Sequence, residues 1–141
     1  MKKLLILRGL PGSGKSRLTK MLVKFLVGCK KDAVICSADH YFKRGREYAF
    51  DPSKIGIAHS QCQVKALLAM SSEKRLVIID NTNTQQWEYE LYVQMGKAFG
   101  YEIEIKTVGG HSPEDAEEYF KRNIHNIPRD SILRMATRWE E

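Results

Sequence analysis

Near its beginning the sequence reads Leu4-Leu5-Ile6-Leu7-Arg8-Gly9-Leu10-Pro11-Gly12-Ser13-Gly14-Lys15-Ser16. The spacing from Gly9 to Ser16, Gly-x-x-x-x-Gly-Lys-Ser, is that of a phosphate-binding loop. Glycines let backbone N–H groups come close to phosphate oxygens. Lys15 is expected to neutralise the β- and γ-phosphates of a nucleotide, and the Ser16 hydroxyl to bind Mg²⁺. The alternative is a glycine-rich turn with a surface lysine.

The flanks of this loop favour the first interpretation. An apolar run of strand type precedes it, and apolar residues follow it at helical spacing: Leu18, Met21, Leu22, Phe25 and Leu26. Further strands are predicted over 33–36, 76–80 and 101–108, with helices between them. Together with the phosphate loop, this alternation predicts an α/β fold, a three-layer P-loop NTPase with a four-stranded parallel sheet. The helix after residue 53 is expected to bury Ile57, Val64, Leu67 and Leu68.

A chain of 141 residues fits one domain, spanning 1–141. Gly109-Gly110 reads as a flexible joint, and Ser112-Pro113 starts a helix with a capping serine and a proline in its first turn. We therefore expect a helical lid over about 109–127. A last helix starts near Pro128. The two tryptophans stand at helical positions and are expected in the core rather than as base-stacking platforms: Trp87 and Trp139.

Charge is spread unevenly along the chain. Residues 1–50 hold 12 basic and 3 acidic residues, whereas residues 51–141 hold 11 and 14. A basic segment around the phosphate loop suits a polyanion such as nucleic acid, or is an ordinary solvated face. Three cysteines without C-x-x-C spacing read as ordinary thiols, and a zinc site from Cys29, Cys36 and His40 has poor spacing. No apolar run has membrane-spanning length, so we expect a cytoplasmic protein without a membrane partner.

Two aspartates end predicted strands, Asp39 after the second and Asp80 after the third. Ligands of parallel sheets lie beyond the carboxyl ends of the strands, so both should point toward the phosphates. Asp80 suits the shell of Mg²⁺, or caps the next helix. Its neighbour is Asn81, not the glutamate with which many ATPases of this class activate water. By elimination the phosphate goes to another acceptor, which predicts a kinase.

In that reaction Asp39 is the candidate base that accepts the proton of the acceptor hydroxyl; alternatively it is a turn residue. Arg122 lies in the predicted lid and is the candidate that stabilises the transferring phosphate. Its alternative role is a surface ion pair with Glu118, one turn earlier.

Longer stretches add a resemblance that covers nearly the whole chain: LRGLPGSGKS, SADHYF, FDPSKIGIAH, VIIDNTNTQQWE, FGYEIEI and RNIHNIPRDSILRMATRWE. Through them the chain resembles the polynucleotide-kinase-like P-loop family. Members of that family include a bacteriophage polynucleotide 5′-kinase and kinase-like domains of vertebrate ubiquitin-ligase-binding proteins. The resemblance implies ATP-dependent phosphorylation of a 5′-hydroxyl on DNA or RNA. It places the catalytic aspartate on Asp39, the loop lysine and serine on Lys15 and Ser16, and the strand-end aspartate on Asp80.

The chain departs from the phage kinase at two positions. Phe42 stands where that enzyme has an arginine that grips the acceptor phosphate, and Asn126 stands where it has a second lid arginine. Lys43, Arg44 and Arg46 can compensate for the first departure, and Arg122 takes more weight after the second.

Together these residues predict an ATP·Mg²⁺-dependent phosphotransferase that acts on a nucleic-acid 5′-hydroxyl, with no obligate protein partner implied. Two alternatives stay open, a kinase of a small hydroxyl compound and a nucleotide-dependent binding module without turnover. Catalytic roles fall to Lys15, Asp39 and Arg122. Nucleotide binding falls to Gly9, Pro11, Gly12, Ser13, Gly14, Lys15, Ser16, Arg17 and Arg122, and metal binding to Ser16 and Asp80. Substrate contacts fall to Asp39, Phe42, Lys43, Arg44, Arg46, Asn81 and Asn83.

Overall fold

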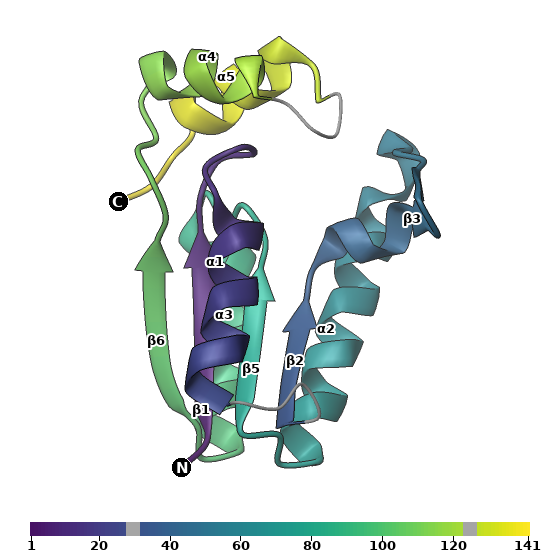
Figure 1. The fold of residues 1–141 in the computed structure, drawn as a ribbon, viewed down its shortest axis with the longest axis vertical. Helices are drawn as coiled ribbons and strands as arrows, with labels where there is room; N and C mark the ends of the chain where they lie inside the picture. The colour runs from purple at the N-terminus through teal and green to yellow at the C-terminus, as the bar shows by residue number, and fades with distance from the viewer. Residues whose placement is uncertain (28–31, 123–126) are drawn as a thin grey trace.

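A four-stranded parallel sheet organises the chain (Figure 1). The computed structural model describes residues 1–27, 32–122 and 127–141, and at Leu26, Val27 and Arg44 it describes the backbone alone; Cys29 and Asn126 lie outside these ranges. The order in the sheet is β2-β5-β1-β6. Its strands are β1 (Lys3–Arg8), β2 (Ala33–Cys36), β5 (Leu76–Asp80) and β6 (Glu102–Thr107). The predicted α/β fold and the four parallel strands are confirmed.

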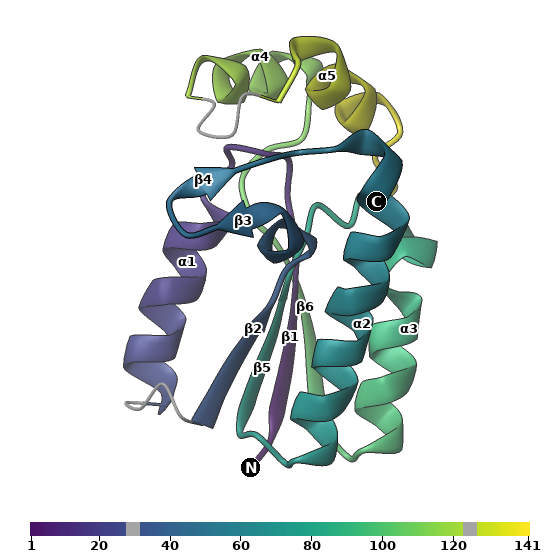
Figure 2. The same cartoon turned by 90° about the vertical axis from the view of Figure 1, so that its right-hand side faces the viewer.

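Helices cover both faces of the sheet (Figure 2). On one face lies α1 (Lys15–Leu22), which continues as a π-helical turn over Val23–Val27. On the other face lie α2 (Ile55–Ser71) and α3 (Gln86–Ala98). Successive side chains of β1 point to opposite faces, as the pleat requires. Leu5 and Leu7 therefore pack in a cluster with α1, while Leu4 and Ile6 pack with α2 and α3.

The buried face of α2 differs from the one expected. Small side chains and one methionine lie against the sheet, namely Ala58, Cys62, Ala66, Ala69 and Met70. The four large residues expected to be buried are between 42% and 60% exposed: Ile57, Val64, Leu67 and Leu68. This prediction was wrong because α2 carries two sets of apolar residues at helical spacing, one large and one small, so its period does not select one face. The alanine face allows the helix axis to approach the sheet closely.

This orientation predicts an unusual pair of stability effects. Ala66 is fully buried, so Ala66→Leu forces extra volume into a packed layer and should lower the free energy of unfolding by about 1–3 kcal/mol. Leu68 is 60% exposed, so Leu68→Ala should cost only about 0.5 kcal/mol. Urea unfolding monitored by circular dichroism measures both values. A loss of about 2–5 kcal/mol for Leu68→Ala, as for a buried leucine, contradicts the observed orientation.

A pair of short helices lies over the carboxyl ends of the strands (Figure 1). They are α4 (Pro113–Lys121) and α5 (Arg129–Thr137). Ser112 and Asp115 form a capping box at the start of α4, as its sequence predicts. The two helices share one apolar cluster that includes Leu10 of the phosphate loop. We call α4 and α5 together the cap; it extends beyond the lid expected over 109–127.

A short hairpin follows β2 in a segment for which the sequence predicted no strand. A 3₁₀ turn over Ala38–Phe42 leads into β3 (Lys43–Arg44), which pairs antiparallel with β4 (Glu47–Tyr48). A second 3₁₀ turn, Pro52–Lys54, enters α2. The hairpin lies at the same end of the sheet as the cap (Figure 2). None of the helices in the described part of the chain is long and apolar enough to span a bilayer.

Candidate active site

The loop between β1 and α1 has the geometry of an anion site. Gly14 caps α1 with a left-handed backbone (φ 103°), and no side chain accepts the first N–H groups of this helix. Lys15 folds back, and its Nζ donates to the carbonyl oxygens of Gly9 (2.7 Å) and Leu10 (3.1 Å). The Oγ of Ser13 is buried without a hydrogen-bond partner in this structure. These free donors at a helix N-terminus are what a phosphate group satisfies.

Burial also acts on the charge of the loop lysine. Desolvation lowers the pKa of Lys15, and the carboxylates of Asp80 and Asp39 oppose this effect. A buried ammonium is stabilised by a nearby negative charge. A nucleotide phosphate supplies such a charge, so the loop and its lysine fit a nucleotide as ligand.

The two strand-end aspartates lie in the same electrostatic environment as this lysine. Burial raises the pKa of Asp80, while Lys15 lowers it and Asp39 raises it. Asp80 ends β5, and Asp39 stands in the 3₁₀ turn just after β2, the neighbour of β5 in the sheet. Carboxyl ends of parallel strands meet at one edge, which explains why residues 41 positions apart in the chain gather at the loop.

One oxygen of Asp39 already has a partner. The hydroxyl of Tyr48 on β4 donates to Asp39 Oδ1 at 2.9 Å, and the N–H of Asp39 donates to Ser37 Oγ at 3.2 Å. Sequence reasoning missed Tyr48 because its hairpin was not predicted. The contact leaves Oδ2 of the carboxylate as the oxygen able to face an acceptor hydroxyl.

Two asparagines expected to contact substrate make hydrogen bonds within the scaffold. Asn81 is buried, and its Oδ1 accepts from the N–H of Ala38 at 2.9 Å, which ties β5 to the turn that carries Asp39. Asn83 is buried with a left-handed backbone (φ 47°), and its Nδ2 donates to the carbonyl of Leu7 at 2.7 Å. Each side chain thus has a backbone partner, and the substrate role expected for the two residues stays a prediction.

Phe42 likewise lies inside the protein. It is 5% exposed and packs with Ala38 and Ala58, with its ring edge-on to Tyr41 and Phe50. It anchors the hairpin rather than offering a surface to a substrate.

The basic residues of the hairpin lie outside the small apolar cluster around Phe42. Lys43 and Arg46 are exposed on the hairpin, and Arg44 is described by its backbone alone. The structure thus places Lys43 and Arg46 where an anionic acceptor can reach them, four and seven positions beyond Asp39.

Arg122 lies on a tyrosine that packs against the phosphate loop. Its guanidinium lies 5.0 Å from the ring centre of Tyr119, at the end of α4. Tyr119 packs on Gly12 so closely that a Cβ at Gly12, whose φ is 85°, would lie 3.0 Å from the tyrosine Cβ. Arg122 itself is exposed. Arg122 is therefore linked to the loop through the ring of Tyr119.

Arg8 is a second residue that sequence reasoning missed. Buried at the end of β1, it donates to the carbonyls of Asn83 (2.8 Å), Thr84 (3.0 Å) and Glu140. Its guanidinium also lies 4.6 Å from the ring centre of Trp139. The segment that follows α5 is thus fixed beside the phosphate loop. Trp139 is half-buried as expected, whereas Trp87 is 75% exposed, so the prediction of a core position for Trp87 was wrong.

Hard-cation ligands at the loop are few. Across residues 1–27, 32–122 and 127–141, no group of three or more His, Cys, Asp or Glu side chains forms a metal cluster. A site for Mg²⁺ needs less, because this ion keeps several waters and takes one or two protein oxygens beside the phosphates. The exposed Ser16 hydroxyl and the Asp80 carboxylate supply such oxygens. Cys36 and Cys62 are free, and burial raises the pKa of both thiols, that of Cys36 to about 12.

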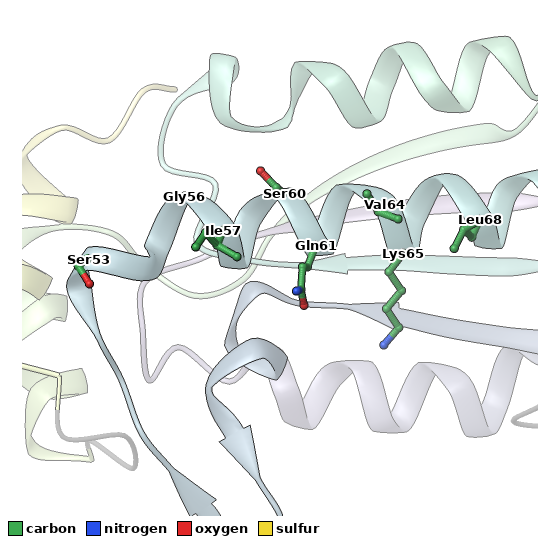
Figure 3. Close-up of a pocket in the computed structure, with 8 residues that line it drawn as sticks. All are labelled: Ser53, Gly56, Ile57, Ser60, Gln61, Val64, Lys65 and Leu68. Carbon is green, nitrogen blue, oxygen red and sulfur yellow. The ribbon is translucent and has the colours of Figure 1, made fainter.

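A surface hollow lies away from the loop. It runs along the outer face of α2, and Figure 3 shows its lining. That lining is Ser53, Gly56, Ile57, Ser60, Gln61, Val64, Lys65 and Leu68. The large side chains of α2 that point away from the sheet form this hollow, so it follows from the helix orientation described above. The site at the strand ends is defined by its donors and charges, not by cavity size.

A glycine-rich loop with a folded-back lysine and two strand-end carboxylates beneath a helical cap defines a P-loop domain of kinase-like type. Residues 4–138 match the family model described as "AAA domain", and the chain belongs to that family.

The chain is also similar to a curated human protein and, in its fold, to solved structures. The chain is 35% identical over 137 residues to human NEDD4-binding protein 2. The matched segment is 97% of this chain and 8% of that protein. Among solved structures, a chain of the Pnkp1/Rnl/Hen1 RNA repair complex matches with a TM-score of 0.67 at 22% identity, over 97% of this chain and 43% of that one. The APS kinase CysC of Mycobacterium tuberculosis matches with a TM-score of 0.57 at 19% identity, over 77% and 76%. The chain thus spans a small part of the curated relative, and the two structures share its fold.

Proposed function

We propose that this domain is an ATP-dependent kinase that transfers the γ-phosphate of ATP to a 5′-hydroxyl of DNA or RNA. The single observation that carries the proposal is that Lys15, Asp80 and Asp39 lie close together at the end of the sheet. Against the effect of burial, both carboxylates raise the pKa of Lys15, and Lys15 lowers the pKa of Asp80. A phosphate-loop lysine beside a carboxylate that is not needed for the metal is the arrangement that activates a hydroxyl acceptor rather than only holding a nucleotide.

In the proposed reaction the acceptor oxygen attacks the γ-phosphorus. The bond from this phosphorus to the oxygen that bridges to the β-phosphate breaks, and ADP leaves with the bond electrons. Asp39 accepts the acceptor's proton through Oδ2, since Tyr48 occupies Oδ1. Lys15 neutralises charge on the β- and γ-phosphates once it exchanges the carbonyls of Gly9 and Leu10 for phosphate oxygens. Mg²⁺ held by Ser16 and Asp80 supplies further charge neutralisation when bound.

Two features support nucleic acid as the acceptor. Lys43 and Arg46 lie exposed on the hairpin that follows Asp39, and the first 50 residues carry a large excess of basic side chains. A basic surface next to the base suits an acceptor that carries further phosphates beyond its 5′-hydroxyl. The RNA repair complex among the structural neighbours is consistent with this acceptor class, while the APS kinase neighbour keeps a small acceptor as the second candidate.

Transfer of label from γ-labelled ATP with Mg²⁺ tests the proposal. The acceptors are 5′-hydroxyl DNA and RNA oligonucleotides, nucleosides and a panel of small hydroxyl compounds, with Lys15→Ala as blank. We expect label on an oligonucleotide end, and weaker acceptor binding as salt rises. Label on a small compound alone assigns the domain to the second candidate. ATP binding without label on any acceptor makes it a nucleotide-dependent binding module.

A further inference from the structure

We propose that Tyr48 is a positioning residue that holds Asp39 in its reacting orientation and couples the basic hairpin to this carboxylate. The inference rests on the proposed kinase function and adds a residue to it. Tyr48 reaches the site from β4, nine positions after Asp39, and its hydroxyl donates to Oδ1 of that residue at 2.9 Å.

The surroundings fix the tyrosine ring. Tyr48 is half-buried, pairs in register with Lys43 across the hairpin, and packs against Phe42 with ring centres 6.1 Å apart. The hairpin closes through the N–H of Ala49, which donates to the carbonyl of Phe42 at 2.9 Å. The strand pairing fixes the backbone of Tyr48 and the contact with Phe42 fixes its ring, so the hydroxyl approaches Asp39 from one direction. The side chain of Asp39 is thereby held at one oxygen, with the other left for the acceptor.

The Tyr48 hydroxyl keeps its proton, and so remains a hydrogen-bond donor, at any pH at which Asp39 becomes charged and tyrosine is normally neutral. Burial raises the pKa of Tyr48, and the negative charge of Asp39 and the hydrogen bond to it raise it further. Other charged groups around Asp39 come from several elements: Lys15 on α1, Asp80 on β5, His40 in the 3₁₀ turn and Lys43 on β3. Among these groups Tyr48 is the one joined to Asp39 by a hydrogen bond that the structure shows.

The hydrogen bond links acceptor binding to the base. Lys43 stands opposite Tyr48 in the hairpin register, so a phosphate that binds Lys43 or Arg46 acts on the same two short strands that orient Asp39. A hairpin of two-residue strands has little stability of its own, so its position depends on such contacts. An acceptor with phosphates beyond its first nucleotide should therefore benefit from Tyr48 more than a short acceptor does.

Tyr48→Phe removes the hydroxyl and keeps the ring, and Tyr41→Phe is the matched control because its ring also packs on Phe42. In the γ-phosphate transfer assay we expect Tyr48→Phe to lower kcat about tenfold or more, since hydrogen bonds to charged groups are among the stronger ones. The KM for ATP should stay unchanged, because Tyr48 is not part of the phosphate loop. Tyr41→Phe should leave both constants as in the unaltered protein. An unchanged kcat in Tyr48→Phe overturns the inference, as does an equal loss in both variants.

A second measurement does not depend on the acceptor. Urea unfolding of Tyr48→Phe, Asp39→Ala and the double variant forms a double-mutant cycle. We expect Tyr48→Phe to lower the urea midpoint in the unaltered background and to lower it less once Asp39 is alanine. Additive losses show that the two side chains do not interact and overturn the inference. Failure of the unaltered protein to phosphorylate any acceptor refutes the proposed function instead, and the cycle then still decides whether Tyr48 holds Asp39.

Discussion

Replacement of Asp39 by asparagine is expected to lower kcat about 10²–10⁴-fold while nucleotide affinity stays unchanged. Asparagine keeps the shape of the side chain and can still accept the Tyr48 hydrogen bond through its amide oxygen. It cannot take the acceptor's proton, so the transition state loses the base while the phosphate loop remains intact. Because Asp39 influences the charge of Lys15 less than Asp80 does, nucleotide binding should be little affected.

Steady-state kinetics with saturating 5′-hydroxyl oligonucleotide, together with titration of a fluorescent ATP analogue, measures the two effects separately. Asp130→Asn is the matched control, since Asp130 is an exposed aspartate in the first turn of α5. It should leave kcat and affinity as they are. An Asp39→Asn protein with the kcat of the unaltered protein would falsify the general-base role.

Replacement of Arg122 by alanine is expected to lower kcat by about 10³–10⁵-fold, the range observed when an arginine that stabilises a transferring phosphoryl group is removed. This corresponds to roughly 4–7 kcal/mol of transition-state stabilisation. In the structure the guanidinium rests on Tyr119, whose ring packs on Gly12 of the loop. A nucleotide with a γ-phosphate offers Arg122 a stronger partner than an aromatic face at an exposed position.

The neighbouring lysine provides the control for this variant. Lys121 is exposed on α4 and pairs with Glu118 at 3.2 Å, and exposed pairs contribute at most about 1 kcal/mol. Lys121→Ala should therefore leave kcat within about twofold of the unaltered protein, since it removes only this surface pair. A loss below about tenfold for Arg122→Ala, or equal losses for the two variants, rules out a role for Arg122 in stabilising the transferring phosphate.

The parts of the fold that depend on residues adjacent in the sequence were predicted from the sequence. The phosphate loop and the strands around it follow from residues that are adjacent in the chain, and the parallel order places Asp39 and Asp80 near the loop without further information. The orientation of α2 did not follow, because its large and its small apolar residues both recur at helical spacing, and it is the small ones such as Ala66 that meet the sheet. The buried face of α2 is therefore determined by packing against the sheet and not by the period of its apolar residues.

The candidate site likewise contains residues that belong to a contiguous motif and residues whose contacts are distant in the sequence. Lys15 and Ser16 belong to a contiguous motif and were found from it. Tyr48 was missed because strands of two residues carry no periodic signal. The hydrogen bond from Asn83 to the carbonyl of Leu7 joins positions 76 residues apart, so no local pattern could predict it.

The attachments of the cap determine how it can move. On its entry side the N–H of Val108 donates to the carbonyl of Arg8 at 2.7 Å, and on its exit side the N–H of Glu140 donates to the carbonyl of Thr84 at 2.8 Å. A third attachment lies between these two, since the apolar cluster of the cap includes Leu10 of the phosphate loop. The cap is therefore joined to the nucleotide end of the sheet at its entry, at its exit and through its core, so a substitution that loosens any of these contacts should also disturb the position of Tyr119 over Gly12.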